Sequence, residues 1–285
     1  MDLVIRRARR RDKRQVLEAV RTIWDGHDRV PHVFDRWVTH RTGPFFVALS
    51  AGRVVGMGKL TVLSRSEAWL EGGRVAPRWR RRGIATALFA HRIAYARERG
   101  FRVLRFSTAS DNTPIHRAAR RFAFKRIAVL QRFEASALRG DPPRRARGAD
   151  TRAIRRALGP LIQFHPGWEW RTLTMSDARQ AVARRRAFAA GDGVGAAAII
   201  GPSDDGSLIV LAVGGRGRAL RDLLVGLRAE AARRRLGAVS LYLSGSERRQ
   251  AARSAGYRLP WTGAAYLYER TLRPRAGSKP SPARR

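Results

Sequence analysis

The order of predicted elements occurs twice along this chain, and this repetition restricts the fold more than any other feature. The first half reads as strand, helix, short helix, two-stranded hairpin, strand, a long helix ending at Gly100, strand and helix. In the second half a hairpin around 191–193, a strand at 207–213, a helix ending at Gly237 and a strand at 238–245 follow in the same order. Glycine just after a helix is a common C-terminal cap. We therefore predict two copies of one mixed α/β unit with a mixed sheet.

A chain of 285 residues is long enough for two modest domains. The segment 138–150 is rich in proline, glycine and arginine and has no periodicity, which is typical of a linker. We predict a first domain over 1–137, a second over 151–273, and a disordered basic tail over 274–285.

The formal charge of +37 is extreme, although 44% hydrophobic residues support folded cores. Nearly all of the basic residues are arginines spread along the whole chain, beside abundant alanine and glycine, which is typical of GC-rich coding. The alternative is an anionic partner. In either case we expect nonspecific binding of nucleic acid at low salt.

The chain contains no cysteine, and its histidines are scattered, so we predict no metal site. The first fifteen residues lack the apolar core of a secretory signal, and no apolar run approaches a membrane span. We expect a cytoplasmic protein with no membrane partner.

One strand-to-helix connection has the composition of an anion site. A predicted strand at 68–75 is followed by three arginines, Arg80–Arg82, and then by Gly83, which opens the long helix. The start of a helix has unpaired N–H groups and partial positive charge, and glycine lets a ligand approach the backbone. An ordinary turn with solvated arginines is the alternative, and the pattern alone leaves both open.

The same residues carry a family resemblance. Val75-Ala76-Pro77 followed by Arg80-Arg81-Arg82-Gly83-Ile84-Ala85 resembles the R/Q-x-x-G-x-G/A signature of the GNAT N-acetyltransferase superfamily, and the order of strands and helices over about 1–135 is similar. The segment WDGHDRVP…FDRW, with AWLEGGRVAP, is closest to the subgroup that includes histidine N-acetyltransferase. The resemblance implies a GNAT acyl-CoA N-acyltransferase fold in two tandem units.

The resemblance also implies the roles of particular residues. The third strand would expose its backbone to the pantetheine arm, and the helix start would hold the pyrophosphate of acetyl-CoA. The implied cofactor-binding residues are Gly73, Val75, Arg80, Arg81, Arg82, Gly83, Ile84, Ala85, Thr86 and Asn112.

The chain departs from the family pattern in three places. Ala119 stands where members often have a tyrosine that protonates the leaving thiolate, which puts the general acid in doubt. One strand follows Phe124 where the fold usually has two, and 168–174 is a candidate for the other. The second unit has a shorter strand-to-helix connection without the motif, so we predict a degenerate copy with no acetyl-CoA site.

Glu71 is the candidate general base, because amine attack on a thioester requires a neutral amine. The alternative is a strand carboxylate paired with an arginine. Trp24, Asp25 and Asp28 are candidates for the acceptor wall, where acidic side chains would hold a cationic amine; the alternative for these acids is helix capping and turn formation. His116, one turn after Asn112, is interpreted as a partly buried histidine of a short helix.

These features lead us to expect an enzyme, an acetyl-CoA-dependent N-acetyltransferase that acts on a primary amine of a small molecule or amino acid. Two alternatives remain: a nucleic-acid-binding protein and a non-catalytic CoA-binding protein, each on a relic transferase fold.

Overall fold

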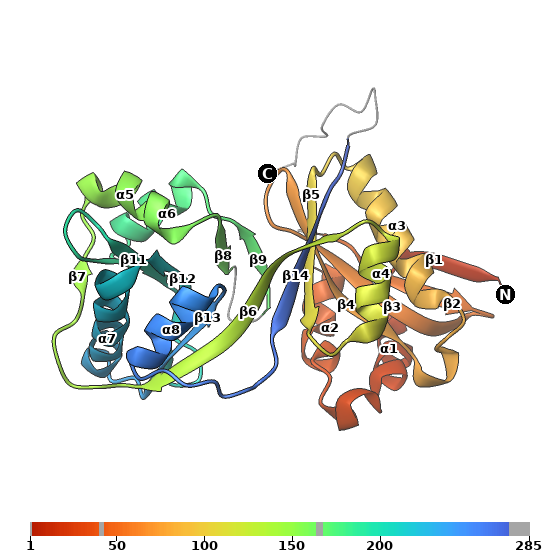
Figure 1. Ribbon diagram of the computed structural model, residues 1–285. Coiled ribbons are helices and arrows are strands. Elements are labelled where there is room, and N and C mark those ends of the chain that lie inside the picture. Colours follow the sequence, from red (N-terminus) through yellow and green to blue (C-terminus); the bar gives the residue numbers. More distant parts are fainter. Residues whose placement is uncertain (1, 40–42, 164–167, 274–285) are drawn as a thin grey trace. The chain divides into compact units, whose positions relative to one another are not determined.

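The computed structural model describes residues 2–39, 43–163 and 168–273 (Figure 1). The predicted tail 274–285 lies outside the described residues. Over the described ranges, no helix combines the length and the apolar character needed to cross a bilayer.

The chain divides into two compact units. Among the described residues, the first contains 2–106, 114–125 and 268–273; the second contains 107–113 and 126–267. This division does not follow the predicted domain boundary at residue 137, because two terminal strands are exchanged between the sequence repeats.

The first unit is a twisted sheet with helices on both of its faces (Figure 1). Its elements in chain order are β1 (Leu3–Arg7), α1 (Lys13–Val20), α2 (Val30–Thr39), β2 (Phe45–Ser50), β3 (Arg53–Val62), β4 (Glu67–Val75), α3 (Ile84–Glu98), β5 (Val103–Ala109) and α4 (Thr113–Arg121), with short 3₁₀ turns at Arg10–Asp12, Ile23–Gly26 and Pro77–Trp79. The strands lie in the order β1-β2-β3-β4-β5, with β4 and β5 parallel. The predicted elements of this half are all present.

The predicted hairpin shows why these residues form this structure. Ala51 and Gly52 have φ of 46° and 73°, the pair of left-handed residues that a tight two-residue turn needs. The alternation of the strands then sends Phe45 to the face packed against α2 and Phe46 to the face packed against α3. Both side chains are 3% exposed, so this sheet is buried on both faces.

The second unit repeats the plan. Its elements are β6 (Lys125–Ser136), β7 (Arg144–Arg145), α5 (Thr151–Leu158), β8 (Leu161–Gln163), β9 (Trp170–Thr172), α6 (Met175–Ala183), β10 (Ala187–Ala190), β11 (Ala196–Ile200), β12 (Ser207–Gly215), α7 (Gly217–Arg233), β13 (Ala238–Leu243) and α8 (Ser246–Ser254). The strand order β7-β10-β11-β12-β13 matches β1-β2-β3-β4-β5, and β12 and β13 are again parallel. The predicted linker thus contains β7, which pairs with β10 as the first strand of the second unit.

The last strand of each sequence repeat joins the other unit. The strand β6 ends the first repeat, yet it pairs antiparallel with β13, with Ser136 opposite Ala238. The C-terminal strand β14 (Ala265–Thr271) lies next to β5 in the sheet order. The expectation that 168–174 supplies a strand to the first unit is wrong, because β9 pairs with β8 in a separate two-stranded sheet. The exchange is possible because the two repeats are equivalent. Each repeat has an open strand edge with unpaired backbone groups, and either terminal strand can pair with it.

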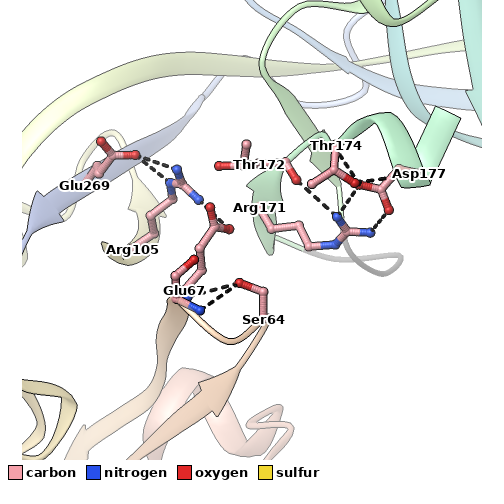
Figure 2. Close-up of polar contacts among 9 residues, drawn as sticks. Ser64, Glu67, Arg105, Arg171, Thr172, Thr174, Asp177 and Glu269 are labelled. Carbon is pink, nitrogen blue, oxygen red and sulfur yellow. Dashed lines mark hydrogen bonds and ion pairs between the residues drawn. The ribbon is translucent and has the colours of Figure 1, made fainter. Parts of the chain in front are cut away.

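An ion-pair cluster attaches β14 to the first unit (Figure 2). The guanidinium of Arg105 in β5 contacts the Glu67 carboxylate of β4 at 3.1 Å and the Glu269 carboxylate of β14 at 2.7 Å. The Arg105 side chain is 6% exposed, so it needs both carboxylates to compensate for its burial. Beside this cluster the ring of Tyr268 stacks on Phe106 with 5.1 Å between centroids.

Figure 2 also shows a cluster that belongs to the second unit and caps α6. The Thr174 hydroxyl accepts a hydrogen bond from the Asp177 N–H, and the Asp177 carboxylate accepts one from the Thr174 N–H, which is a capping box. Arg171 of β9 binds the same carboxylate in a bidentate manner at 2.7 and 2.5 Å. These contacts and the Arg171 guanidinium lower the pKa of Asp177, although burial opposes the shift most strongly.

We expect Glu269→Gln to lower the free energy of unfolding by about 1–3 kcal/mol, because Arg105 would keep only one of its two carboxylates. Urea denaturation followed by tryptophan fluorescence measures the effect. Glu18→Gln is the matched control, since Glu18 makes a solvent-exposed pair with Arg21 and should cost less than about 0.5 kcal/mol. Equal stability of the two variants would show that the cluster does not hold β14.

Candidate functional site

The connection between β4 and α3 forms an open helix start. Arg81 and Gly83 have φ of 64° and 78°, and a Cβ added to Gly83 would meet no atom within 4 Å. The carbonyl of Gly83 accepts the N–H of Ala87 at 3.0 Å, and within the described chain no side chain caps this end of the helix. The first N–H groups of a 15-residue helix are therefore available to an anionic ligand.

The side chains around this turn are of two kinds: exposed arginines, and one buried apolar residue that packs against the sheet. Arg80, Arg81 and Arg82 are all exposed, and the Arg82 guanidinium lies over the ring of Trp79 at 5.0 Å from its centroid. Ile84 is buried against β3, so only its backbone is placed to contact a ligand. Ala85 is exposed and Thr86 is half-buried on the first turn of α3. The turn thus places positive charge around an accessible backbone.

Strand β4 leaves β5 just before this turn. Its parallel pairing with β5 ends at Trp69, opposite Arg105, whereas its pairing with β3 continues to Val75. The pairing with β3 shifts register between Met57 and Lys59. Gly73 is exposed and Val75 half-buried on the part of β4 that extends beyond β5. An extended ligand could follow this stretch of backbone toward the start of α3.

A buried arginine that sequence reasoning missed supports the irregular strand from α3. Arg92 is 2% exposed and donates to the carbonyls of Lys59 at 3.3 Å, Glu71 at 3.2 Å and Leu88 at 3.1 Å. Burial lowers its pKa to about 10, and the nearby Glu71 carboxylate opposes the shift. The group therefore stays charged at neutral pH. Its one sequence signal is a basic residue on a helix face that is otherwise apolar.

We expect Arg92→Met to lower the free energy of unfolding by about 2–4 kcal/mol, because two strand carbonyls would lose their donor in a buried place. The measurement is urea denaturation of the full chain. Arg97→Met on the exposed face of the same helix is the matched control and should cost less than about 0.5 kcal/mol. A loss no larger than that of the control would contradict a supporting role for Arg92.

Glu71 lies where β4 has separated from β5. Its Oε1 accepts a hydrogen bond from the Thr61 hydroxyl of β3, and its Oε2 is 3.9 Å from Nη2 of Arg29. The Glu71 side chain is 12% exposed. This placement is compatible with both interpretations of Glu71. The carboxylate has an arginine partner, as a structural carboxylate would, but the contact is long and the Arg29 side chain is half exposed, so the carboxylate could also act as a base.

The segment before α2 differs from the predicted acceptor wall. Asp28 is buried, with one carboxylate oxygen accepting the N–H of Val30 and the other accepting Nε of Arg74 at 2.6 Å. Its charge is neutralised within the fold, so the expectation that Asp28 holds a cationic acceptor does not fit this placement, and capping of α2 is what its geometry provides. Trp24 is exposed over Arg74 at 4.2 Å, and Asp25 is exposed; both have positive φ.

The remaining candidate residues lie on α4 or directly before it. Ala119 is fully buried, and Asn112 donates its amide to the Thr108 hydroxyl at 2.9 Å. Asn112 falls in the second unit, so its contact with a cofactor stays a prediction. His116 is half-buried, as expected, and its Nδ1 is 3.0 Å from the hydroxyl of Tyr268 on β14, a partner that no local pattern predicts.

The corresponding connection in the second unit is much shorter. Arg216 alone separates β12 from α7, whereas eight residues, 76–83, separate β4 from α3. A cavity of about 430 Å³ lies at this place, lined by glycines and by the arginines 156, 216 and 248. Across the described residues there is no group of three or more histidine, aspartate or glutamate side chains arranged to hold a metal.

Comparisons with known proteins agree with this architecture. Residues 7–124 match the sequence model of the acetyltransferase (GNAT) family. A GCN5-related N-acetyltransferase from Sphaerobacter thermophilus has a similar fold, with TM-score 0.64 at 15% identity over 95% of this chain and 96% of that one. A tandem GNAT protein from the clavulanic acid biosynthesis pathway is also similar, with TM-score 0.55 at 17% identity over 96% of this chain and 100% of that one.

No curated protein matches the chain in sequence. The family match covers the β4–α3 connection and every element from α1 to the end of α4. Residues 7–124 are therefore a domain of the acetyltransferase (GNAT) family, in a chain whose whole fold is that of two tandem GNAT units.

Proposed function

We propose that the first unit binds acetyl-CoA and transfers its acetyl group to the primary amine of a small molecule. The observation that carries the proposal is the start of α3, where an uncapped helix end follows a left-handed glycine with open space around it. Family membership of residues 7–124 makes acetyl transfer the activity to expect.

The residues present fit such a cofactor. The N–H groups of 81–86 would hold the pyrophosphate, and Arg80–Arg82 would add charge around it. The backbone of Gly73 and Val75 would align the pantetheine arm. Acetyl-CoA would supply an acetyl group activated as a thioester.

Glu71 would act as the general base. The amine nitrogen bonds to the acetyl carbonyl carbon as the carbon–sulfur bond breaks, and the proton lost by nitrogen passes to the Glu71 carboxylate, directly or through water. The sulfur departs as a thiolate and takes a proton from solvent. The Thr61 hydroxyl orients the carboxylate for this step.

A transfer screen tests the proposal. Purified full-length protein is incubated with acetyl-CoA and with amino acids, polyamines or short peptides, and free thiol is detected together with the acetylated product. We expect amine-dependent thiol release with a small amine as acceptor. Failure of every small amine, with efficient acetylation of a protein or long peptide, would overturn the small-molecule assignment. Binding dominated by RNA or DNA, with no acetyl-CoA complex at physiological salt, would overturn the proposal as a whole.

A further inference from the structure

An arginine close to the candidate base is only partly engaged. Arg29 sits just before α2, and its side chain is 51% exposed. Among the described residues its one ion pair is the 3.9 Å contact with Glu71, which is near the outer limit for such a pair. A half-exposed pair at that separation contributes little to stability, so a ligand can replace it at little cost.

The neighbouring charges are already compensated. Asp28 is paired at 2.6 Å with Arg74, whose guanidinium also donates to the carbonyl of Gly73 and lies under the ring of Trp24. The Arg74 side chain is 15% exposed, so it presents much less charge to solvent than Arg29 does. Arg29 therefore presents the more accessible positive charge beside the Glu71 carboxylate.

The position of Arg29 is held by packing. Its guanidinium lies 5.9 Å from the centroid of the Trp37 ring, and Trp37 is buried against Gly72 of β4, where an added Cβ would come within 2.6 Å of the ring. The tight contact between Trp37 and Gly72 fixes α2 against the strand that carries Glu71. The cation and the carboxylate are thus set side by side by the core.

We propose that the acceptor is a free amino acid, whose α-carboxylate binds Arg29 while its α-amine faces Glu71. This rests on the proposed function. In a zwitterion the ammonium and the carboxylate flank one carbon, so one small molecule satisfies both side chains and replaces their long mutual contact. A guanidinium recognises a carboxylate through two parallel N–H donors, which distinguishes a free acid from a neutral amide. Exposed Trp24 offers an apolar surface for the side chain of the amino acid.

The test compares free amino acids with their carboxamides. L-Histidine, L-phenylalanine and L-lysine are each paired with the corresponding amide, and kcat and KM are measured with acetyl-CoA saturating. We expect kcat/KM for at least one free acid to exceed that of its amide by about tenfold to a hundredfold, the usual value of a charge-assisted contact. Amidation also lowers the basicity of the amine, which favours the amide chemically, so a preference for the acid reports recognition.

Arg29→Gln should remove this preference by raising KM for the free acid about tenfold to a hundredfold, with KM for the amide and for acetyl-CoA unchanged. Arg29→Lys should restore part of the preference, because a lysine keeps the charge without the planar fork. Arg21→Gln is the matched control: it removes one exposed arginine just beyond α1 and should leave the preference intact.

Calorimetric titration of the same free acid into the wild type and Arg29→Gln gives a readout that does not depend on turnover. Amides accepted as well as free acids by the wild type, or equal losses for acid and amide in Arg29→Gln, would overturn the role of Arg29. If no amine is acetylated, the proposed function fails and the acceptor role fails with it. Calorimetry then decides separately whether Arg29 binds the α-carboxylate: binding of the amino acid that depends on Arg29 supports that site, and its absence overturns it.

Discussion

A Gly83→Glu variant is expected to bind acetyl-CoA at least about a hundredfold more weakly than the wild type. A carboxylate at this position would stand among the N–H groups that are proposed to hold the pyrophosphate. Two like charges about 4 Å apart at a protein surface repel by roughly 4 kcal/mol, which is nearly a thousandfold in affinity. Isothermal titration calorimetry of acetyl-CoA into the full chain measures the loss, and the wild type should bind one equivalent, because only the first unit has the long glycine-containing connection.

Gly52→Glu is the matched control for this experiment. Gly52 has φ of 73°, close to the 78° of Gly83, and an added Cβ would likewise meet no atom within 4 Å, but it lies at the tip of the β2–β3 hairpin. Both variants carry the same left-handed strain and the same charge, so a difference between them reports the ligand. Unchanged affinity in Gly83→Glu, or two equivalent sites in the wild type, would contradict the placement of the cofactor.

Local chemistry allowed most elements of the fold to be predicted. The Ala51–Gly52 turn, Gly100 after α3 and the alternation of the strands are signals carried by neighbouring residues. The second long helix does not end at Gly237 as expected: α7 ends at Arg233, and Arg235, with φ of 59°, takes the left-handed conformation that Gly100 has after α3. The internal repeat predicted two copies of one mixed α/β unit, and the matching order of β1–β5 and of β7 with β10–β13 confirms that repetition. The strand β7 itself was not predicted, because it lies in the segment interpreted as a linker.

Local sequence signals could not predict the exchange of β6 and β14 between the two units. Both strands follow a short helix and end a repeat, so each could pair with either β5 or β13. The choice depends on contacts between residues far apart in the chain, such as Arg105 with Glu269 and Phe106 with Tyr268. The sequence shows an arginine on a predicted strand of the first repeat and a glutamate near the C-terminus. No local pattern indicates that these two side chains form an ion pair.

The parts of the candidate site that depend on backbone conformation could be predicted from the sequence, whereas the parts that depend on pairing between side chains could not. The helix start at Gly83 needs only a glycine, a preceding turn and a helix, so the motif placed it correctly at the N-terminus of α3. The acceptor side depends on which charges pair, and Asp28 illustrates the difficulty: it stands in an acidic, aromatic loop, yet Arg74, 46 residues away, neutralises it. The accessible charge beside Glu71 therefore belongs to Arg29, which the sequence did not single out.

Glu71→Gln is expected to lower kcat about 10²–10⁴-fold while leaving the affinity for acetyl-CoA nearly unchanged, because general-base assistance typically contributes that much. The amide oxygen of glutamine can still accept the Thr61 hydroxyl, and the Glu71 carbonyl bound by Arg92 is backbone, so the strand should keep its shape. Steady-state kinetics across pH tests the role. In the variant only the neutral amine reacts, so its rate should rise about tenfold per pH unit below the pKa of the amine, and the difference from the wild type should narrow at high pH.

Glu67→Gln distinguishes loss of a base from loss of a strand carboxylate. Glu67 lies on the same strand, and its partner Arg105 would keep Glu269, so this variant loses one buried ion pair without touching the proposed chemistry. It should be less stable than the wild type but have wild-type kcat under conditions in which it is folded. If Glu71→Gln behaves in the same way, with a lower free energy of unfolding, a normal rate and a normal pH profile, then Glu71 is a structural carboxylate paired with Arg29, and the proton must leave the amine by another route.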